Sequence, residues 1–243
     1  MKVFVCSDIH GNVRALNAVI ERYLALSAPD LLFLGDCVGY GAHPDACLDV
    51  VLNIPRARLI LGNHDSALLR AAERGDLNEI AAEAIGWSES FLGGRYDEAI
   101  RRRFLMEHDG GLYFAVHGSP HHPEEWIYIF SALEAEQAFF ARQFSVCFVG
   151  HTHSPAIYAF GRGEMRLSEG TPFPLDAAER YIINPGSVGQ PRDGDPRAAC
   201  CLFDADAGTI TLFRCEYDVE AEARDIVDAG LPTFLGERLL YGS

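Results

Sequence analysis

The chain has 243 residues, of which 49% are hydrophobic and 23% charged, and its formal net charge is −15. A chain of this size and composition can bury a core without disulfide bonds. The acidic excess argues against a general nucleic-acid binder, and no run approaches the ~18 uninterrupted apolar residues of a membrane span.

The first third of the chain alternates between short apolar runs and helical patterns. Strands are predicted over residues 2–7, 31–36 and 58–63. Asn12 is placed to cap a helix that runs to about residue 26, and a second helix is predicted over 44–53. This alternation is typical of βαβ units, so we expect a sheet that is at least partly parallel.

Residues 66–105 have a different pattern, with apolar positions at helical spacing and no clear strand. We interpret this segment as a helical insertion. Strand character resumes over 111–119, and a helix over 131–143 leads into a strand over 145–149.

The remainder reads mostly as short strands joined by Gly and Pro turns. The predicted strands are 156–160, 164–168, 180–184, 198–204 and 209–215. An acidic helix is predicted over 218–230, and another can follow Pro232. We therefore expect residues 1–243 to form a single domain, α/β at first and mostly antiparallel β afterwards.

The cysteine and lysine content indicates the redox state of the thiols and excludes two lysine-dependent kinds of site. The seven cysteines are odd in number and include no C-x-x-C, which is typical of reduced thiols in a cytoplasmic protein. The apolar part of the N-terminus is too short for an export signal, which also favours the cytoplasm. Lys2 is the only lysine, so neither a P-loop nor Schiff-base catalysis is expected.

Polar residues follow five of the predicted strands at the point where each strand ends. They are Asp8 and His10, Asp36, then Asn63, His64 and Asp65, then His117, and finally His151 and His153. Ligand sites of α/β sheets lie at the carboxyl ends of strands, so we expect these side chains to meet. One D-x-H alone is more typical of a turn, but this set uses five of the nine histidines.

The spacing and residue types of this set suggest two metal ions. In extended backbone, residues two apart point the same way, so His151 and His153 are expected to face one cluster while Thr152 points away. Asp8 and His10 have the same spacing. A mixed His, Asp and Asn set suits Mn, Fe, Co, Ni or Zn rather than Ca. The set offers more ligands than one open catalytic ion can use, including a mononuclear iron centre, and a carboxylate is the best bridge between two ions.

The series D-I-H, G-D, G-N-H-D, H and G-H-T-H resembles the signature blocks of the calcineurin-like metallophosphoesterases. These blocks lie within residues 1–153. A later block over 183–197, INPGSVGQPRDGDPR, is similar to the small bacterial and archaeal phosphodiesterase branch of that superfamily. The resemblance implies an α/β (α+β) fold, a four-layer β-sandwich of mixed sheets flanked by helices.

The resemblance also implies a role for each matching residue. One metal would be held by Asp8, His10 and His153, and the other by Asn63, His117 and His151, with Asp36 as the bridge. The cofactors would be two divalent transition-metal ions, with Mn favoured and Fe, Zn, Ni and Co as alternatives. His64 would face the substrate as general acid while a hydroxide between the metals attacks phosphorus, and Asp65 could orient His64 through a hydrogen bond.

The expected activity is that of a phosphodiesterase acting on a small phosphorylated or nucleotide substrate. The alternatives are a phosphomonoesterase, a dinucleoside-polyphosphate hydrolase, a protein phosphatase and a non-catalytic metal-binding module. G-D-C-V-G-Y-G lacks the Arg that protein phosphatases of this superfamily carry there, and G-N-H-D replaces their G-N-H-E. We expect no general nucleic-acid or membrane partner, and the sequence indicates no oligomeric state.

Residues that contact the substrate are harder to identify. Asn12 either donates to a phosphate or only caps its helix. Arg192 either binds phosphate through both guanidinium arms or forms a surface salt bridge. Trp87 and Phe91, four residues apart in the helical segment, fit a core pair better than a stacking platform.

Overall fold

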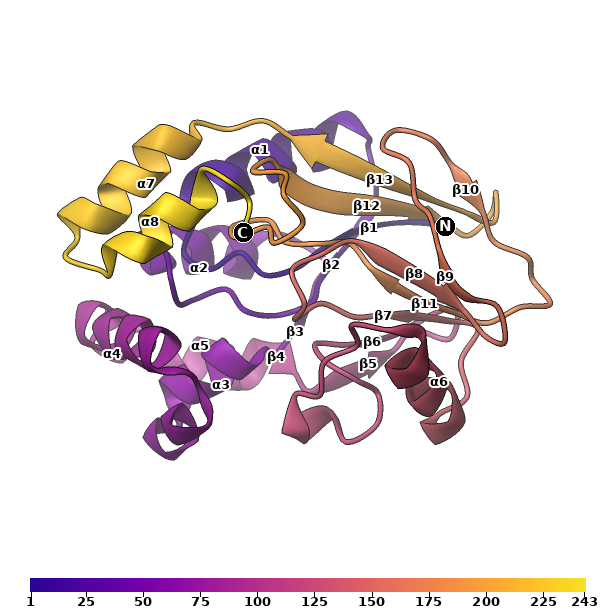
Figure 1. Ribbon diagram of the computed structural model, residues 1–243, viewed down its shortest axis with the longest axis horizontal. Helices are drawn as coiled ribbons and strands as arrows, with labels where there is room; N and C mark the ends of the chain where they lie inside the picture. Colours follow the sequence, from indigo (N-terminus) through magenta and orange to yellow (C-terminus); the bar gives the residue numbers. More distant parts are fainter.

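Two mixed β-sheets face each other in the computed structural model, which describes residues 1–243 (Figure 1). The seven-stranded sheet has the order β10 (Phe173–Pro174), β13 (Thr209–Cys215), β12 (Ala198–Asp204), β1 (Lys2–Cys6), β2 (Asp30–Phe33), β3 (Ala57–Ile60) and β4 (Phe104–Leu105). The six-stranded sheet has the order β5 (Glu107–Asp109), β6 (Phe114–Val116), β7 (Val146–Phe148), β11 (Tyr181–Asn184), β8 (Ala156–Ala159) and β9 (Gly163–Met165).

Each sheet combines parallel and antiparallel pairs of strands. β1 to β4 are parallel to one another, and β12 joins β1 in antiparallel register. In the second sheet β6, β7 and β11 are parallel. The parallel β1–β2–β3 portion is the one that the βαβ pattern predicts, and it brings the carboxyl ends of these strands to one edge.

Strand alternation divides the core into layers. Val3 and Val5 of β1 pack in the apolar cluster shared by the two sheets, together with Phe148 and Ile183 of the second sheet. Phe4, between the two valines, belongs instead to the cluster under the helices on the outer face. A period of two in the sequence thus gives the seven-stranded sheet two buried faces.

Helices cover the outer face of both sheets, which completes four layers (Figure 1). On the seven-stranded sheet these are α1 (Val13–Ala25) and α2 (Pro44–Asn53), and on the six-stranded sheet α6 (Ala132–Ala141). The C-terminal helices α7 (Val219–Asp228) and α8 (Thr233–Leu239) pack on α4 (Glu79–Leu92) through a separate apolar cluster. The predicted fold class is therefore confirmed.

Residues 66–105 are largely helical, as expected. They include most of α3 (Asn63–Leu69), the 3₁₀ helix η1 (Ala71–Asp76), α4 and α5 (Asp97–Arg103), and they end in β4. The sequence analysis missed β4, β5 and β10 because strands of two or three residues are too short to show a period. That this segment is an insertion in a single domain stays a prediction.

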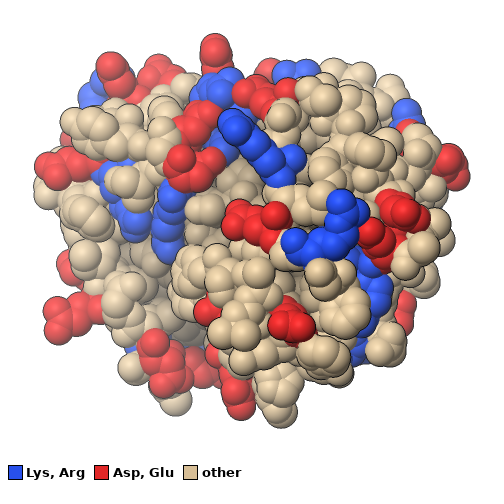
Figure 2. Space-filling model, turned by 45° about the vertical axis from the view of Figure 1, so that its right-hand side comes forward, with Lys and Arg blue, Asp and Glu red and all other residues tan.

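The surface in Figure 2 shows Asp and Glu side chains beside most groups of Lys and Arg side chains. This face therefore has no broad area of positive charge. No helix has the length and apolar character required to cross a bilayer.

Candidate metal centre

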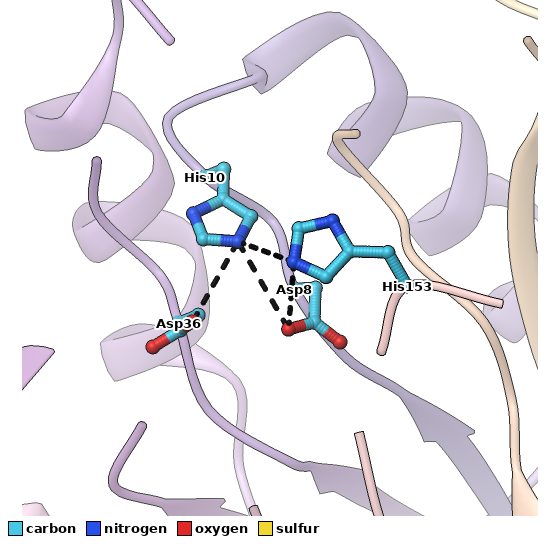
Figure 3. A group of neighbouring side chains, drawn as sticks. All are labelled: Asp8, His10, Asp36 and His153. Atoms are coloured by element: carbon cyan, nitrogen blue, oxygen red, sulfur yellow. Dashed lines mark hydrogen bonds and ion pairs between the residues drawn. The ribbon is translucent and has the colours of Figure 1, made fainter. Parts of the chain in front are cut away.

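The side chains predicted at the five strand ends meet in one buried site. Atoms of Asp8, His10, Asp36 and His153 all lie within 4.8 Å of one another, and so do atoms of Asp36, His117 and His151. Figure 3 shows the first of these groups, with its side chains converging from separate loops. Asp36 belongs to both groups, which is the arrangement that a bridging carboxylate requires.

The first group is centred on the Nε2 atom of His10. This atom lies 3.1 Å from His153 Nε2 and 3.6 Å from Asp36 Oδ2. Asp8 Oδ1 lies 3.4 Å from His153 Nε2 (Figure 3). Potential metal-ligand atoms of Asp8, His10 and His153 thus lie on one side of Asp36 Oδ2.

The second group is centred on the Nε2 atom of His117. It lies 3.1 Å from His151 Nδ1 and 3.3 Å from Asp36 Oδ2. Asn63 Oδ1 lies 3.2 Å from the same nitrogen. The division between the two groups is the one that the resemblance implied, although the ligand roles themselves stay predictions.

Backbone carbonyls orient three of the imidazoles. The Nδ1 atoms of His10, His117 and His153 lie 3.0, 2.7 and 2.7 Å from the carbonyl oxygens of Val38, Leu34 and Gln190. Hydrogen bonds of this kind place the proton on Nδ1, so the lone pair of Nε2 points into the site.

The donor set fits two divalent cations. Asp8 Oδ1 and Asp36 Oδ2 are fully buried and accept no hydrogen bond. Buried carboxylate oxygens without a partner are costly, and a cation between them removes that cost. Burial also raises the pKa of Asp8 to about 6. Burial would lower the pKa of His117, but Asp36 outweighs it and raises that pKa to about 9.

The backbone that presents these ligands is not extended, so the geometric reason given for the D-x-H and H-x-H spacing is wrong. The φ angles of Asp8, His10, His151 and His153 are 56°, 48°, 69° and 60°. With these similar φ angles, Asp8 and His10 enter the same group, whereas His151 and His153 enter different groups. Thr152 points away as expected, and its Oγ1 accepts from Asn184 Nδ2 at 3.0 Å.

The block over 183–197 holds two of the ligand loops, a role that the sequence analysis missed. Asn184 Nδ2 donates to the carbonyl of Gly150 at 2.7 Å, and Ser187 Oγ donates to the carbonyl of Asp8 at 2.8 Å. A Cβ on Gly189 would lie 1.7 Å from the carbonyl oxygen of Ile9, so only glycine fits there.

Asp65 does not orient His64, contrary to expectation. Its carboxylate accepts hydrogen bonds from the backbone N–H groups of Asp36 at 2.8 Å, Cys37 at 2.9 Å and Gly62 at 3.2 Å. Asp65 is fully buried and ties the Asp36 loop to the start of α3. The hydrogen bonds assign it a positioning role toward Asp36.

His64 lies beside the metal centre. Its ring centroid is 4.7 Å from that of His10 and 4.6 Å from that of Tyr40, and burial lowers its pKa to about 4. It lines a cavity of about 450 Å³ together with Trp126 and Tyr128. The ring of Tyr128 is stacked on that of His151, with 3.7 Å between the ring centroids.

Parts of the helical segment 66–105 line the same cavity. Glu73, Asp76 and Leu77 contribute to its wall, together with Asn78 at the start of α4. Trp87 and Phe91 form a stacked pair at 5.0 Å on α4, and they do not line this cavity. The segment therefore helps to shape the space beside His64.

The structure separates the two substrate-contact candidates. Asn12 uses its whole side chain internally: Oδ1 accepts from Ala15 N, and Nδ2 donates to the carbonyl of Gly189 and to Tyr217 Oη. The capping alternative is therefore correct, and a phosphate contact by Asn12 is wrong. Arg192 is half-buried and forms no salt bridge; its Nη2 donates to Gln190 Oε1 at 2.9 Å.

Comparison with known proteins agrees with this site. Residues 1–208 match the family model described as the calcineurin-like phosphoesterase superfamily domain. The uncharacterized protein MJ0912 of Methanocaldococcus jannaschii is 35% identical over 243 residues, which cover 99% of this chain and 98% of that protein. Phosphodiesterase YfcE of Escherichia coli K12 is 28% identical over 220 residues, or 86% of this chain and 91% of YfcE.

A solved structure matches over the full length. The metallophosphoesterase from Sphaerobacter thermophilus is 35% identical to this chain and superposes with a TM-score of 0.87, and the alignment covers 100% of both chains. The resemblance that the motifs indicated is therefore confirmed.

Proposed function

The chain belongs to the calcineurin-like phosphoesterase superfamily, and from that premise we propose that it is a phosphodiesterase of small phosphorylated or nucleotide compounds. The family match and the phosphoesterase relatives indicate a metal-dependent phosphoester hydrolase. The finer assignment to diesters is supported by the relative named phosphodiesterase YfcE and by the two adjoining cavities described below.

One observation carries the proposal: two groups of buried donors share the carboxylate of Asp36. Two divalent ions, when bound there, supply a water that ionises near pH ~7 and positive charge for the phosphate oxygens. Asp8, His10 and His153 would hold one ion, and Asn63, His117 and His151 the other. We propose Mn as the physiological metal, since the carboxylate and amide oxygens of the set suit Mn.

His64 is the proposed general acid. It lines the 450 Å³ cavity next to the donor groups, and no hydrogen bond ties up its ring. Its proton would go to the departing oxygen of the ester. Burial lowers its pKa, and a substrate phosphate beside the ring raises that pKa again because it stabilises the imidazolium.

The cavity that contains His64 adjoins a second cavity, which leaves room for the second ester group of a diester. Tyr40 and Asn78 line both the cavity that contains His64 and a second one of about 550 Å³. The first has the carboxylates of Glu73, Asp76 and Glu125 in its wall. These acidic groups disfavour a doubly charged monoester, which supports the diester over the phosphomonoesterase alternative.

The remaining assignments are proposals of the same kind. A small phosphorylated substrate is the proposed partner, without nucleic acid or membrane. The cytoplasm is the proposed compartment, which the seven free, buried cysteines support. A non-catalytic module is disfavoured because His64 lies next to both complete donor groups.

The test compares hydrolysis of bis(p-nitrophenyl) phosphate and p-nitrophenyl phosphate by the purified chain. Each substrate is assayed after metal chelation and again after addition of Mn²⁺. We expect turnover that depends on metal and a higher kcat/KM for the diester. A higher kcat/KM for the monoester would overturn the diester assignment and retain the site, whereas turnover unaffected by chelation would overturn the metal chemistry.

A further inference from the structure

Two arginines lie next to each other beside the metal centre, and neither is paired with an Asp or Glu side chain; the Nε of Arg238 donates to the main-chain oxygen of Ser243. Arg192 Nη2 and Arg238 Nη1 donate to the same acceptor, Gln190 Oε1, at 2.9 and 3.1 Å. Arg238 belongs to α8 and Arg192 to the loop before β12, so only the folded chain brings them together. Burial and then the charge of Arg192 lower the pKa of Arg238 to about 10, and no carboxylate opposes this shift.

The ring of Tyr40 lies between the arginine pair and the proposed metal ligands. The guanidinium carbon of Arg192 lies 5.8 Å from the ring centroid of Tyr40. The same ring lies 4.6 Å from His10 and 4.6 Å from His64. Arg192 Nε is fully buried and has no hydrogen-bond partner, so the donors of this guanidinium group are not all satisfied within the protein.

Both guanidinium groups line the cavity of about 550 Å³ that opens on the other side of Tyr40. The N-terminus of α4 forms another part of the wall, with Asn78 capping the helix through a bond from Ala81 N. A helix N-terminus favours anions. Glu79 is the one carboxylate in the lining; its side chain is exposed and makes no ion pair with either arginine.

We propose that this cavity binds a second phosphate group of the substrate while the first phosphate reacts at the metal centre. Adjacent half-buried guanidinium groups repel each other unless an anion lies between them, and phosphate matches their paired N–H donors. The chain has 35 Asp and Glu residues against 20 Lys and Arg residues, yet neither of these two arginines is paired with an Asp or Glu side chain. The inference rests on the proposed function and narrows the substrate class to compounds with two separate phosphate groups.

A binding experiment tests the cavity without depending on turnover. The affinities of thymidine 3′,5′-bisphosphate and thymidine 5′-monophosphate for the Mn-loaded chain are compared by calorimetry. We expect the bisphosphate to bind at least about tenfold more tightly, because charge-assisted hydrogen bonds to the second phosphate are added. Equal affinities for the two ligands would overturn the proposal.

Variants then assign the difference to the arginine pair. Arg238→Gln and Arg192→Gln should each reduce the affinity ratio of bisphosphate to monophosphate by about tenfold, and Arg238→Lys should retain part of it. The matched control is Arg102→Gln, since Arg102 is exposed and has no ion pair. A ratio unchanged in Arg238→Gln would contradict the proposal, and Arg238→Lys decides the question if Arg238→Gln does not fold.

A kinetic comparison separates this inference from the proposed function. The substrates are the 5′-(p-nitrophenyl phosphate) of thymidine with and without a 3′-phosphate. We expect a higher kcat/KM with the 3′-phosphate and a smaller preference in Arg238→Gln. If neither ester nor bis(p-nitrophenyl) phosphate is hydrolysed, the proposed function fails, whereas the affinity ratio still decides whether the second phosphate binds.

Discussion

The buried carboxylate of Asp65 accepts a hydrogen bond from the backbone N–H of Asp36 at 2.8 Å. Asp36 is the side chain shared by both donor groups, and its φ of 60° is strained for a residue other than glycine. Further bonds from Cys37 N and Gly62 N to Asp65 hold the same loop. Asp65, which belongs to neither donor group, thus fixes the position of the proposed bridge.

Asp65→Asn should weaken both stability and metal binding. An amide has one acceptor oxygen in place of two, so its NH₂ group must face backbone N–H donors. We expect a loss of about 2 kcal/mol in the free energy of unfolding and a 10- to 100-fold loss of metal affinity. Urea unfolding measures the free energy and metal titration measures the affinity. The control is Asp228→Asn, which changes an exposed aspartate. Unchanged metal affinity in Asp65→Asn would contradict the positioning role.

Asn184→Ala should impair the loop that carries both histidines of G-H-T-H. Asn184 bonds to the Gly150 carbonyl and to Thr152 Oγ1, and these contacts hold His151 and His153 at positive φ. We expect metal affinity to fall about 10-fold or more, as for other groups that orient ligands. The control is Asn53→Ala, whose side chain bonds only within its own helix. Equal losses in both variants would indicate a general effect on folding.

His64→Ala should separate catalysis from metal binding. The ring contributes no atom to either donor group, so two ions should still bind. Loss of a general acid typically lowers the rate 10²- to 10⁴-fold. The loss should be smaller for bis(p-nitrophenyl) phosphate, because its p-nitrophenolate leaves without a proton, than for an alkyl diester such as a dinucleotide. Equal losses for the two substrates would contradict the acid role.

Much of the site could be predicted from the sequence because a parallel sheet brings the carboxyl ends of its strands together. Asp8, Asp36 and Asn63 each come directly after a recognisable strand, so their meeting follows from topology. The backbone conformation could not be predicted, since positive φ at His151 and His153 depends on distant partners such as Asn184.

The roles of residues that depend on tertiary contacts could also not be predicted from the sequence. Arg238 reaches Arg192 only because α8 packs back on α4, a tertiary contact that no periodicity encodes. Asn12 had two possible roles because an amide can both cap a helix and contact a ligand. The tertiary structure decides between them, because Asn12 Oδ1 accepts from Ala15 N and its Nδ2 donates to Gly189 O and Tyr217 Oη.

The metal content of Asp36→Asn tests the central claim most directly. The account predicts that the purified chain binds two divalent ions, measured by elemental analysis after dialysis against Mn²⁺, and that Asp36→Asn retains at most one. Asp228→Asn, which changes an exposed aspartate in the same way, should retain both. Two ions in Asp36→Asn, or none in the unmodified chain, would contradict a centre built around a shared Asp36 carboxylate.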